Sequence, residues 1–177
     1  VKDIAGNVGT CKTDVIKVDK SSPTCSVDTT TSSNSRGWFT NIPTIKLSDT
    51  TNDNGYSGIN SYGLSTTANT YNNSYTNSQG ETKGQIWYGI IKDNAVNVNT
   101  CNSGSIKVDT SHPSCTNTKN YTTWTAGSRT VTYGCDDSIS GCTGGGTDTV
   151  SDLVTYSKTY TVTNGAGLTN NCTANVY

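Results

Sequence analysis

The chain has 177 residues, of which 31% are hydrophobic and 14% charged, and its formal net charge is −1. The charged residues are scattered, so the sequence offers neither the basic patch that nucleic acids require nor a polybasic membrane-binding patch. The longest apolar runs, such as residues 86–91, are far shorter than the roughly 20 residues of a membrane span, and we expect no membrane insertion of this segment.

Thr, Ser, Asn and Gly dominate the composition, and Tyr is the most frequent aromatic residue. Such residues favour strands and turns, because β-branching and side-chain hydrogen bonds to the backbone compete with the helix. The apolar share lies below the roughly 45–50% of an average domain, so we expect thin cores in which each strand buries one face. Seven cysteines in a small chain are typical of an oxidising compartment, and we therefore expect an extracellular location.

In chain order, the first expected elements are a turn and a strand. Gly6 and Asn7 supply the turn, residues 15–18 form an extended strand, and residues 19–23 are a polar connector stiffened by Pro23. Further runs with strand character cover residues 43–47, 59–64, 85–91, 130–133, 150–156, 158–163 and 173–177. Many short strands separated by turn signals predict an all-β fold of immunoglobulin-like β-sandwiches.

An internal repeat divides the chain. Residues 2–25 and 92–115 are related by a shift of 90 positions, and 14 of these 24 positions are identical. A fainter third copy begins at Asn164 and ends at Cys172. The repeated block combines a last hairpin, a last strand and a linker, so it ends one module and begins the next. We therefore predict two tandem modules, residues 20–109 and 110–177, with residues 1–19 as the C-terminal hairpin of a preceding module.

The repeat also predicts the disulfides, because it places one cysteine at the start of each module and another near its end. The remaining close pair would close a small local loop, and the odd cysteine would find its partner in the preceding module. The expected bonds are therefore Cys25–Cys101, Cys115–Cys172 and Cys135–Cys142, with Cys11 bonded outside this sequence.

Three short segments resemble a known family. Residues 2–8, 18–23 and 137–141 carry the patterns D-x-A-G-N, V-D-x-x-x-P and D-S-x-S-G. These patterns resemble those of the tandem immunoglobulin-like repeats in large bacterial surface proteins and adhesins. The resemblance implies an elongated stalk of end-to-end modules at the cell surface and, as in some members of the family, calcium at the module junctions.

Asp residues near the two linkers are the candidate calcium ligands, because carboxylates are the hard oxygen ligands that calcium prefers. The candidate sets are Asp19 with Asp49 or Asp53 at the first linker, and Asp109 with Asp136 or Asp137 at the second. The alternative interpretation is that these side chains cap turns. Residues 50–61 do not match an EF-hand loop, since the first position is Thr50 and the twelfth is Ser61.

The remaining chemistry-bearing residues are few. The only histidine, His112, lies in a linker that offers neither a nucleophile nor an orienting partner, and we predict no catalytic site. Trp87 belongs to the apolar run 86–91 and is expected in the core. Trp38 and Trp124 lie in polar surroundings and are the candidates for stacking against sugar rings.

The sequence thus favours non-enzymatic stalk or spacer repeats of an extracellular bacterial surface protein or adhesin. Their partners would be the neighbouring modules of the same chain. The alternative is that the modules themselves bind a glycan or a host protein. An open face that clusters Trp38 or Trp124 with tyrosines would favour this second interpretation.

Overall fold

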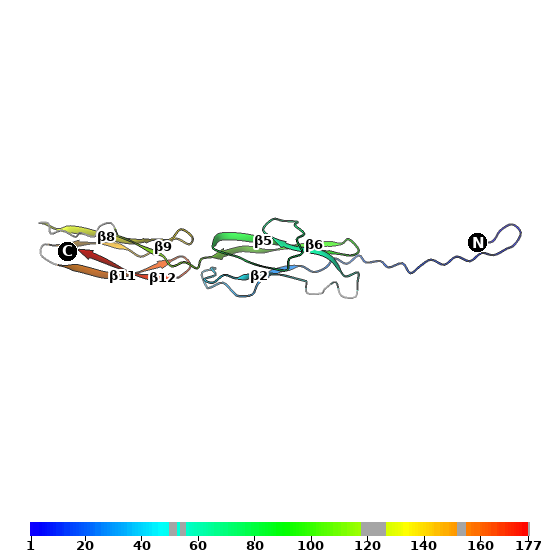
Figure 1. The fold of residues 1–177 in the computed structure, drawn as a ribbon, viewed down its shortest axis with the longest axis horizontal. Coiled ribbons are helices and arrows are strands. Elements are labelled where there is room, and N and C mark those ends of the chain that lie inside the picture. The colour runs from blue at the N-terminus through cyan, green and yellow to red at the C-terminus, as the bar shows by residue number, and fades with distance from the viewer. Residues whose placement is uncertain (50–52, 54–55, 118–126, 152–154, 177) are drawn as a thin grey trace.

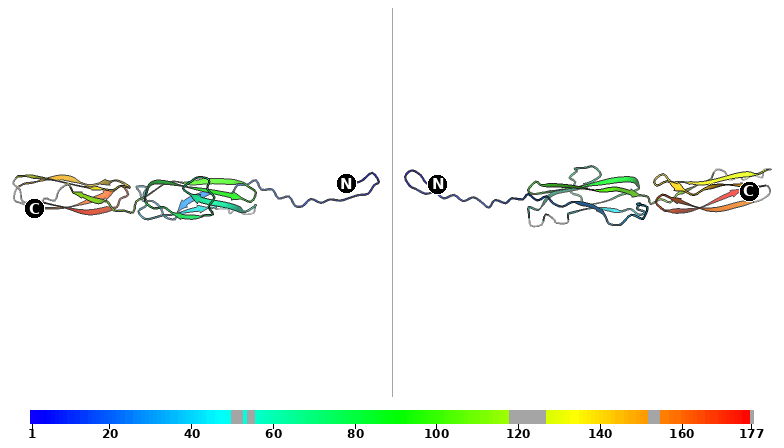
Figure 2. Two further views of the ribbon diagram at one scale, coloured as in Figure 1. Left: turned by 45° about the horizontal axis from the view of Figure 1, so that its top comes forward. Right: turned by 180° about the vertical axis from the view of Figure 1, so that it is seen from behind.

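A computed structural model describes residues 1–49, 53, 56–117, 127–151 and 155–176 of the chain. The molecule is elongated: two β-sandwiches lie end to end, and the N-terminal residues run away from the first sandwich as a single chain (Figure 1). Two further views show the same linear order (Figure 2).

The first sandwich consists of two three-stranded antiparallel sheets, ordered β1-β2-β4 and β3-β5-β6. Its strands are β1 (Ser26–Thr29), β2 (Thr44–Ser48), β3 (Ile59–Ser65), β4 (Thr76–Ser78), β5 (Thr82–Asp93) and β6 (Val98–Val108).

The second sandwich also has two three-stranded antiparallel sheets, ordered β10-β8-β7 and β12-β11-β9. Its strands are β7 (Ser114–Asn117), β8 (Arg129–Asp136), β9 (Cys142–Thr143), β10 (Gly146–Val150), β11 (Tyr156–Asn164) and β12 (Thr169–Val176). Residues 109–113 connect the two sandwiches.

The two sandwiches share one topology. Each places its first, second and fourth strands in one sheet, and its third, fifth and sixth strands in the other. Immunoglobulin domains distribute their strands in the same way, with A, B and E in one sheet and C, F and G in the other. The predicted all-β, immunoglobulin-like class is therefore confirmed.

Each sandwich encloses its own core, built by strands that bury alternate residues. In β2, Ile45 and Leu47 are buried while Thr44 and Lys46 are exposed, as the two-residue period of a half-buried strand requires. The first core contains Val27, Phe39, Ile45, Leu47, Leu64, Trp87, Ile91, Ile106 and Val108. The second contains Val131, Tyr133, Tyr160, Val162, Cys172 and Ala174.

Trp87 lies in the first core as expected. Its indole Nε1 donates a hydrogen bond to Gln79 Oε1 at 2.7 Å, so burial of the ring leaves no polar atom of the indole without a partner.

Three disulfides join the strands. They connect Cys25 with Cys101, Cys115 with Cys172, and Cys135 with Cys142, at Cα–Cα distances of 5.6, 5.8 and 6.0 Å. These are the pairs expected from the cysteine positions in the repeat. The first links the residue before β1 to β6 and the second links β7 to β12, whereas the third closes a turn between β8 and β9.

The N-terminal segment differs from the prediction. Residues 9–25 form no strand, so the strand expected at residues 15–18 is wrong for this chain, and Cys11 is free and exposed. The equivalent residues Ile106 and Val108 are buried in β6, which pairs with β5. No strand in the described part of the chain lies beside residues 15–18, and a strand forms only with a partner.

A second difference concerns residues 150–156, which are not one strand. β10 ends at Val150 and β11 begins at Tyr156, with residues 152–154 outside the described residues. Of the described residues, none forms a helix with the length and apolar character that crossing a bilayer takes.

Candidate functional site at the two junctions

The first junction, where the N-terminal segment meets the first sandwich, gathers three acidic side chains. Asp19 precedes β1, Asp53 lies between β2 and β3, and Asp93 ends β5. One carboxylate oxygen from each residue lies within 4.8 Å of one from each of the other two. Asp93 is 0% exposed and Asp53 is 3% exposed, while Asp19 is half-buried. Three separate segments therefore bring three carboxylates to one largely buried point.

Backbone amides hold the Asp19 carboxylate in place. The N–H groups of Ser21 and Ser57 donate to its two oxygens, each at 2.9 Å. These hydrogen bonds keep the pKa of Asp19 below its usual range, because they stabilise the charged form. Asp19 therefore stays ionised in this cluster at neutral pH.

The two deeper carboxylates are also oriented by their own loops. The N–H of Gly58 donates to Asp53 Oδ2 at 2.8 Å. Asn97 donates twice to Asp93, from its backbone N–H to Oδ1 at 2.7 Å and from its side-chain amide to Oδ2 at 2.8 Å. The same amide nitrogen lies 3.3 Å from the backbone oxygen of Asp19.

Among the described residues, no Lys or Arg forms an ion pair with Asp19, Asp53 or Asp93; the ion pair between Lys158 and Asp148 lies in the second sandwich. Buried carboxylates are costly unless an opposite charge, a proton or a metal ion accompanies them. Three oxygen-bearing side chains without nitrogen or sulfur ligands match the preference of calcium. The arrangement can therefore hold a hard divalent cation.

The prediction for the first linker located part of this cluster. The structure brings Asp19 and Asp53 together, but Asp49 is not a member, and its Oδ1 accepts a hydrogen bond from Thr24 Oγ1 at 2.8 Å. Asp93 was missed. The available signal was the repeated D-x-A pattern at Asp3 and Asp93, which sequence reasoning assigned only to a turn.

The second junction, between the two sandwiches, has a different composition at the matching place. The side-chain amide Nδ2 of Asn164 lies 3.0 Å from Asp109 Oδ2, 2.9 Å from the backbone oxygen of Ser111 and 3.0 Å from Asp137 Oδ2. Asn164 is 1% exposed and Asp109 is 0% exposed. The predicted pair of Asp109 and Asp137 thus meets at the amide of Asn164, which sequence reasoning missed.

Asp137 keeps its charge in this setting. Burial acts to raise its pKa, but hydrogen bonds from the Asn164 amide and from the N–H groups of Ser140 and Ile139 outweigh burial, so the pKa lies below its usual range. The two N–H groups donate to Oδ1 at 2.9 and 3.0 Å, which leaves Oδ2 for Asn164.

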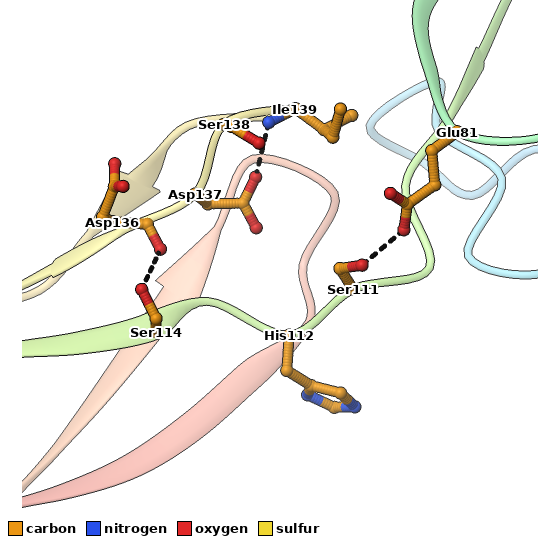
Figure 3. Close-up of a pocket in the computed structure, with 8 residues that line it drawn as sticks. All are labelled: Glu81, Ser111, His112, Ser114, Asp136, Asp137, Ser138 and Ile139. Atoms are coloured by element: carbon orange, nitrogen blue, oxygen red, sulfur yellow. Dashed lines mark hydrogen bonds between the residues drawn. The ribbon is translucent and has the colours of Figure 1, made fainter.

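Asp136 does not join this group. It is exposed, and in Figure 3 its side chain projects away from Asp137. The same view shows Glu81 of the first sandwich reaching Ser111 in the linker, beside a cavity of about 210 Å³. Hydrogen bonds from Ser111 and Thr110 hold the pKa of Glu81 below its usual range, so an ionised Glu81 ties the linker to the first sandwich.

Direct contacts also join the two sandwiches at the second junction. Asn34 Nδ2 donates to the backbone oxygen of Ala166 at 2.7 Å, and Arg36 Nη1 lies 3.5 Å from the backbone oxygen of Asn164. His112 Nδ1 lies 2.6 Å from the backbone oxygen of Thr169, so the linker histidine also takes part in the connection.

Trp38, one of the two tryptophans predicted to stack against sugars, does not lie on an open aromatic face. Trp38 is half-buried with Lys107 Nζ 5.8 Å from its ring centroid, and it borders a cavity of about 160 Å³ lined mostly by Ser, Thr and Asn. Ligand pockets usually enclose roughly 300–1,000 Å³. Trp124 lies outside the described residues. Glycan binding stays a prediction.

No family model matches the sequence, and the search of curated proteins finds no match. The solved structure of fibronectin(III)-like modules of CbhA from Clostridium thermocellum is similar over 86% of this chain and 93% of that chain, at 8% identity and a TM-score of 0.35. At such values, the immunoglobulin-like assignment rests on the strand order described above.

Proposed function

We propose that the chain consists of two structural stalk modules, residues 20–109 and 110–177, of an extracellular bacterial surface protein, and that they carry tension along their long axis. The observation that supports this function best is the position of the two long disulfides. Each joins the first strand of a sandwich, or the residue next to it, to the last strand. The chain enters and leaves each sandwich through these same strands.

Such a disulfide carries an applied force itself, so the residues between its two cysteines are not under tension. When the two ends of the first sandwich are pulled apart, tension passes directly from Cys25 to Cys101 through the disulfide. The 76-residue separation between these cysteines therefore cannot extend. The same holds for the 57-residue separation between Cys115 and Cys172.

Single-molecule force spectroscopy tests this role. The chain is held at its two ends and extended with and without a reducing agent. We expect no large unfolding step under oxidising conditions. After reduction, steps of up to about 250 and about 190 Å should appear, because an extended residue spans roughly 3.3 Å.

Two cysteine-pair variants provide the matched comparison. Replacing Cys115 and Cys172 by Ser should release an unfolding step of the second sandwich under oxidising conditions, shortened by the 7-residue separation that the Cys135–Cys142 bridge still closes. Replacing Cys135 and Cys142 should release none, because their loop lies inside the segment that the Cys115–Cys172 bridge already closes. Large unfolding steps in the oxidised wild-type chain would overturn the proposed mechanical role.

We propose further that calcium binds Asp19, Asp53 and Asp93 at the first junction. Bound there, the ion would fix the direction in which the N-terminal segment leaves the first sandwich. Addition of EDTA should lower the thermal midpoint, and Asp93→Asn should bind calcium at least tenfold more weakly. If protons balance the carboxylates instead, stability will depend on pH and not on the chelator.

A further inference from the structure

The two junctions are built from equivalent residues, as their hydrogen bonds show. At each junction, the linker aspartate accepts a hydrogen bond from the backbone N–H two residues later. A serine hydroxyl in a neighbouring loop also accepts from the backbone N–H of an alanine in the hairpin that follows. The matching bonds are Ser21 to Asp19 and Ser111 to Asp109, Ala95 to Ser57 and Ala166 to Ser140, and Asn94 to Gly58 and Gly165 to Gly141.

This match superimposes Asn164 on Asp93. Oδ1 of Asp93 accepts from the backbone N–H four residues later at 2.7 Å, and Oδ1 of Asn164 accepts from the N–H four residues later at 2.8 Å. The second polar atom differs: it is a carboxylate oxygen in Asp93 and an amide nitrogen in Asn164. A single change at this position therefore turns an acceptor into a donor.

A second difference accompanies the first. The residue four positions after Asp93 is Asn97, whose amide donates to Asp93 Oδ2. Asp3 and Asn7 form the same pair at 2.8 Å in the N-terminal segment. After Asn164 the corresponding residue is Leu168, which has no side-chain donor, and an amide nitrogen at position 164 needs none beside it. The two differences are mutually consistent.

We infer that the Asn164 amide takes the place of the cation at the second junction, so that the chain combines one cation-dependent and one cation-independent junction. The amide nitrogen has three oxygens at 2.9–3.0 Å, two of them carboxylate oxygens of Asp109 and Asp137. With Asn164 in place of a third acidic residue, the second junction has two aspartates where the first has three. Backbone N–H groups of Ser111, Ile139 and Ser140 also donate to these two side chains, so the Asn164 amide acts together with them.

The contrast between the two junctions rests on the proposed calcium site, but the role of the Asn164 amide can be tested separately. The informative variant is Asn164→Asp combined with Leu168→Asn, which copies the arrangement of Asp93 and Asn97. Calcium titration of the full chain by calorimetry should give one ion for the wild type, none for Asp93→Asn and two for the double variant. Thermal unfolding is followed in EDTA and in excess calcium.

In EDTA the second sandwich of the double variant should melt at a lower temperature than in the wild type, and calcium should restore it. Asn170→Asp is the matched control. It makes the same chemical change on the same hairpin, where the amide donates to the backbone oxygen of Pro113 at 3.0 Å, and it should create no calcium site.

Three results would overturn the inference: unchanged stability of the double variant in EDTA, a loss of stability that calcium does not restore, or two calcium ions bound to the wild type. A wild type that binds no calcium would instead refute the proposed site at the first junction. The inference about Asn164 would then be decided by the EDTA and calcium measurements on the double variant.

Discussion

Single residues decide how closely the segments of the first sandwich approach one another. Residues 70–74 cover the outer edge of β3, where Asn72 hydrogen-bonds both the N–H and the backbone oxygen of Leu64, at 3.1 and 2.8 Å. This side chain imitates a neighbouring strand and protects an edge that would otherwise pair with other chains. The close approach is possible because β3 has no side chain at Gly63.

Gly63→Ala should destabilise the first sandwich by about 1–3 kcal/mol, a typical cost of overpacking. A Cβ at this position would overlap the backbone carbonyl of Thr70, which cannot move aside as a flexible side chain can. Gly80→Ala is the matched control, since a Cβ there has nothing within 4 Å. Urea denaturation measures both, and equal stabilities for the two variants would contradict the expected close contact.

Asp137 should make the second sandwich sensitive to acid. Its pKa in the folded chain lies below that in the unfolded chain, so its contribution is complete above the unfolded value of about 4 and is lost as the pH falls through the folded value. The wild type should therefore be more stable than Asp137→Asn near neutral pH, and the difference should shrink below about pH 4. Urea denaturation of both proteins across this pH range tests the prediction. A difference in their free energies of unfolding that does not change with pH would contradict it.

At the scale of elements, the strands with the clearest alternation were predictable. Residues 43–47 nearly coincide with β2, because Ile45 and Leu47 alternate with polar residues. β1 was not predicted, since Val27 is its only buried residue. β6 begins at Val98, well before the buried Ile106 and Val108 that made its end recognisable. Short polar strands are determined by pairing with their neighbours, which a one-dimensional pattern does not record.

The candidate site was predictable only in part, for a similar reason. Asp19 and Asp53 were selected because they lie near a linker in the sequence. Asp93 and Asn164 reach the same two places from the ends of β5 and β11, and the strand register alone brings them there. Their role becomes visible only when the loops at one end of each sandwich are seen together.

The three disulfides should contribute unequally to stability. On the chain-entropy model, a bridge over 76 or 57 residues contributes about 4 kcal/mol, whereas one over 7 residues contributes about 2.5 kcal/mol. Replacing Cys115 and Cys172 by Ser should therefore destabilise the second sandwich more than replacing Cys135 and Cys142. Urea denaturation of the two variants gives the comparison, and a larger loss for the short loop would contradict the model.

The whole molecule combines thin cores with covalent bridges and polar junctions. Each core is small, so the long disulfides add a contribution comparable to the 5–15 kcal/mol of stability that domains commonly have. The sandwiches meet through hydrogen bonds of the linker and of the loops beside it, such as those of Glu81 with the linker (Figure 3) and of Asn34 with Ala166. The stiffness of the rod therefore depends on few contacts, and these can be removed without disturbing either core.

The second junction should loosen when its direct contacts are removed. Asn34→Ala combined with Arg36→Ala eliminates the bonds to the backbone oxygens of Ala166 and Asn164, which lie on the hairpin between β11 and β12. NMR relaxation should then show the two sandwiches tumbling more independently, with shorter correlation times than in the wild type. Thr66→Ala, an exposed position on the loop after β3, should leave tumbling unchanged. Equal correlation times for wild type and double variant would contradict this prediction and would mean that the hydrogen bonds of the linker to Glu81 and Asn164 hold the two sandwiches together.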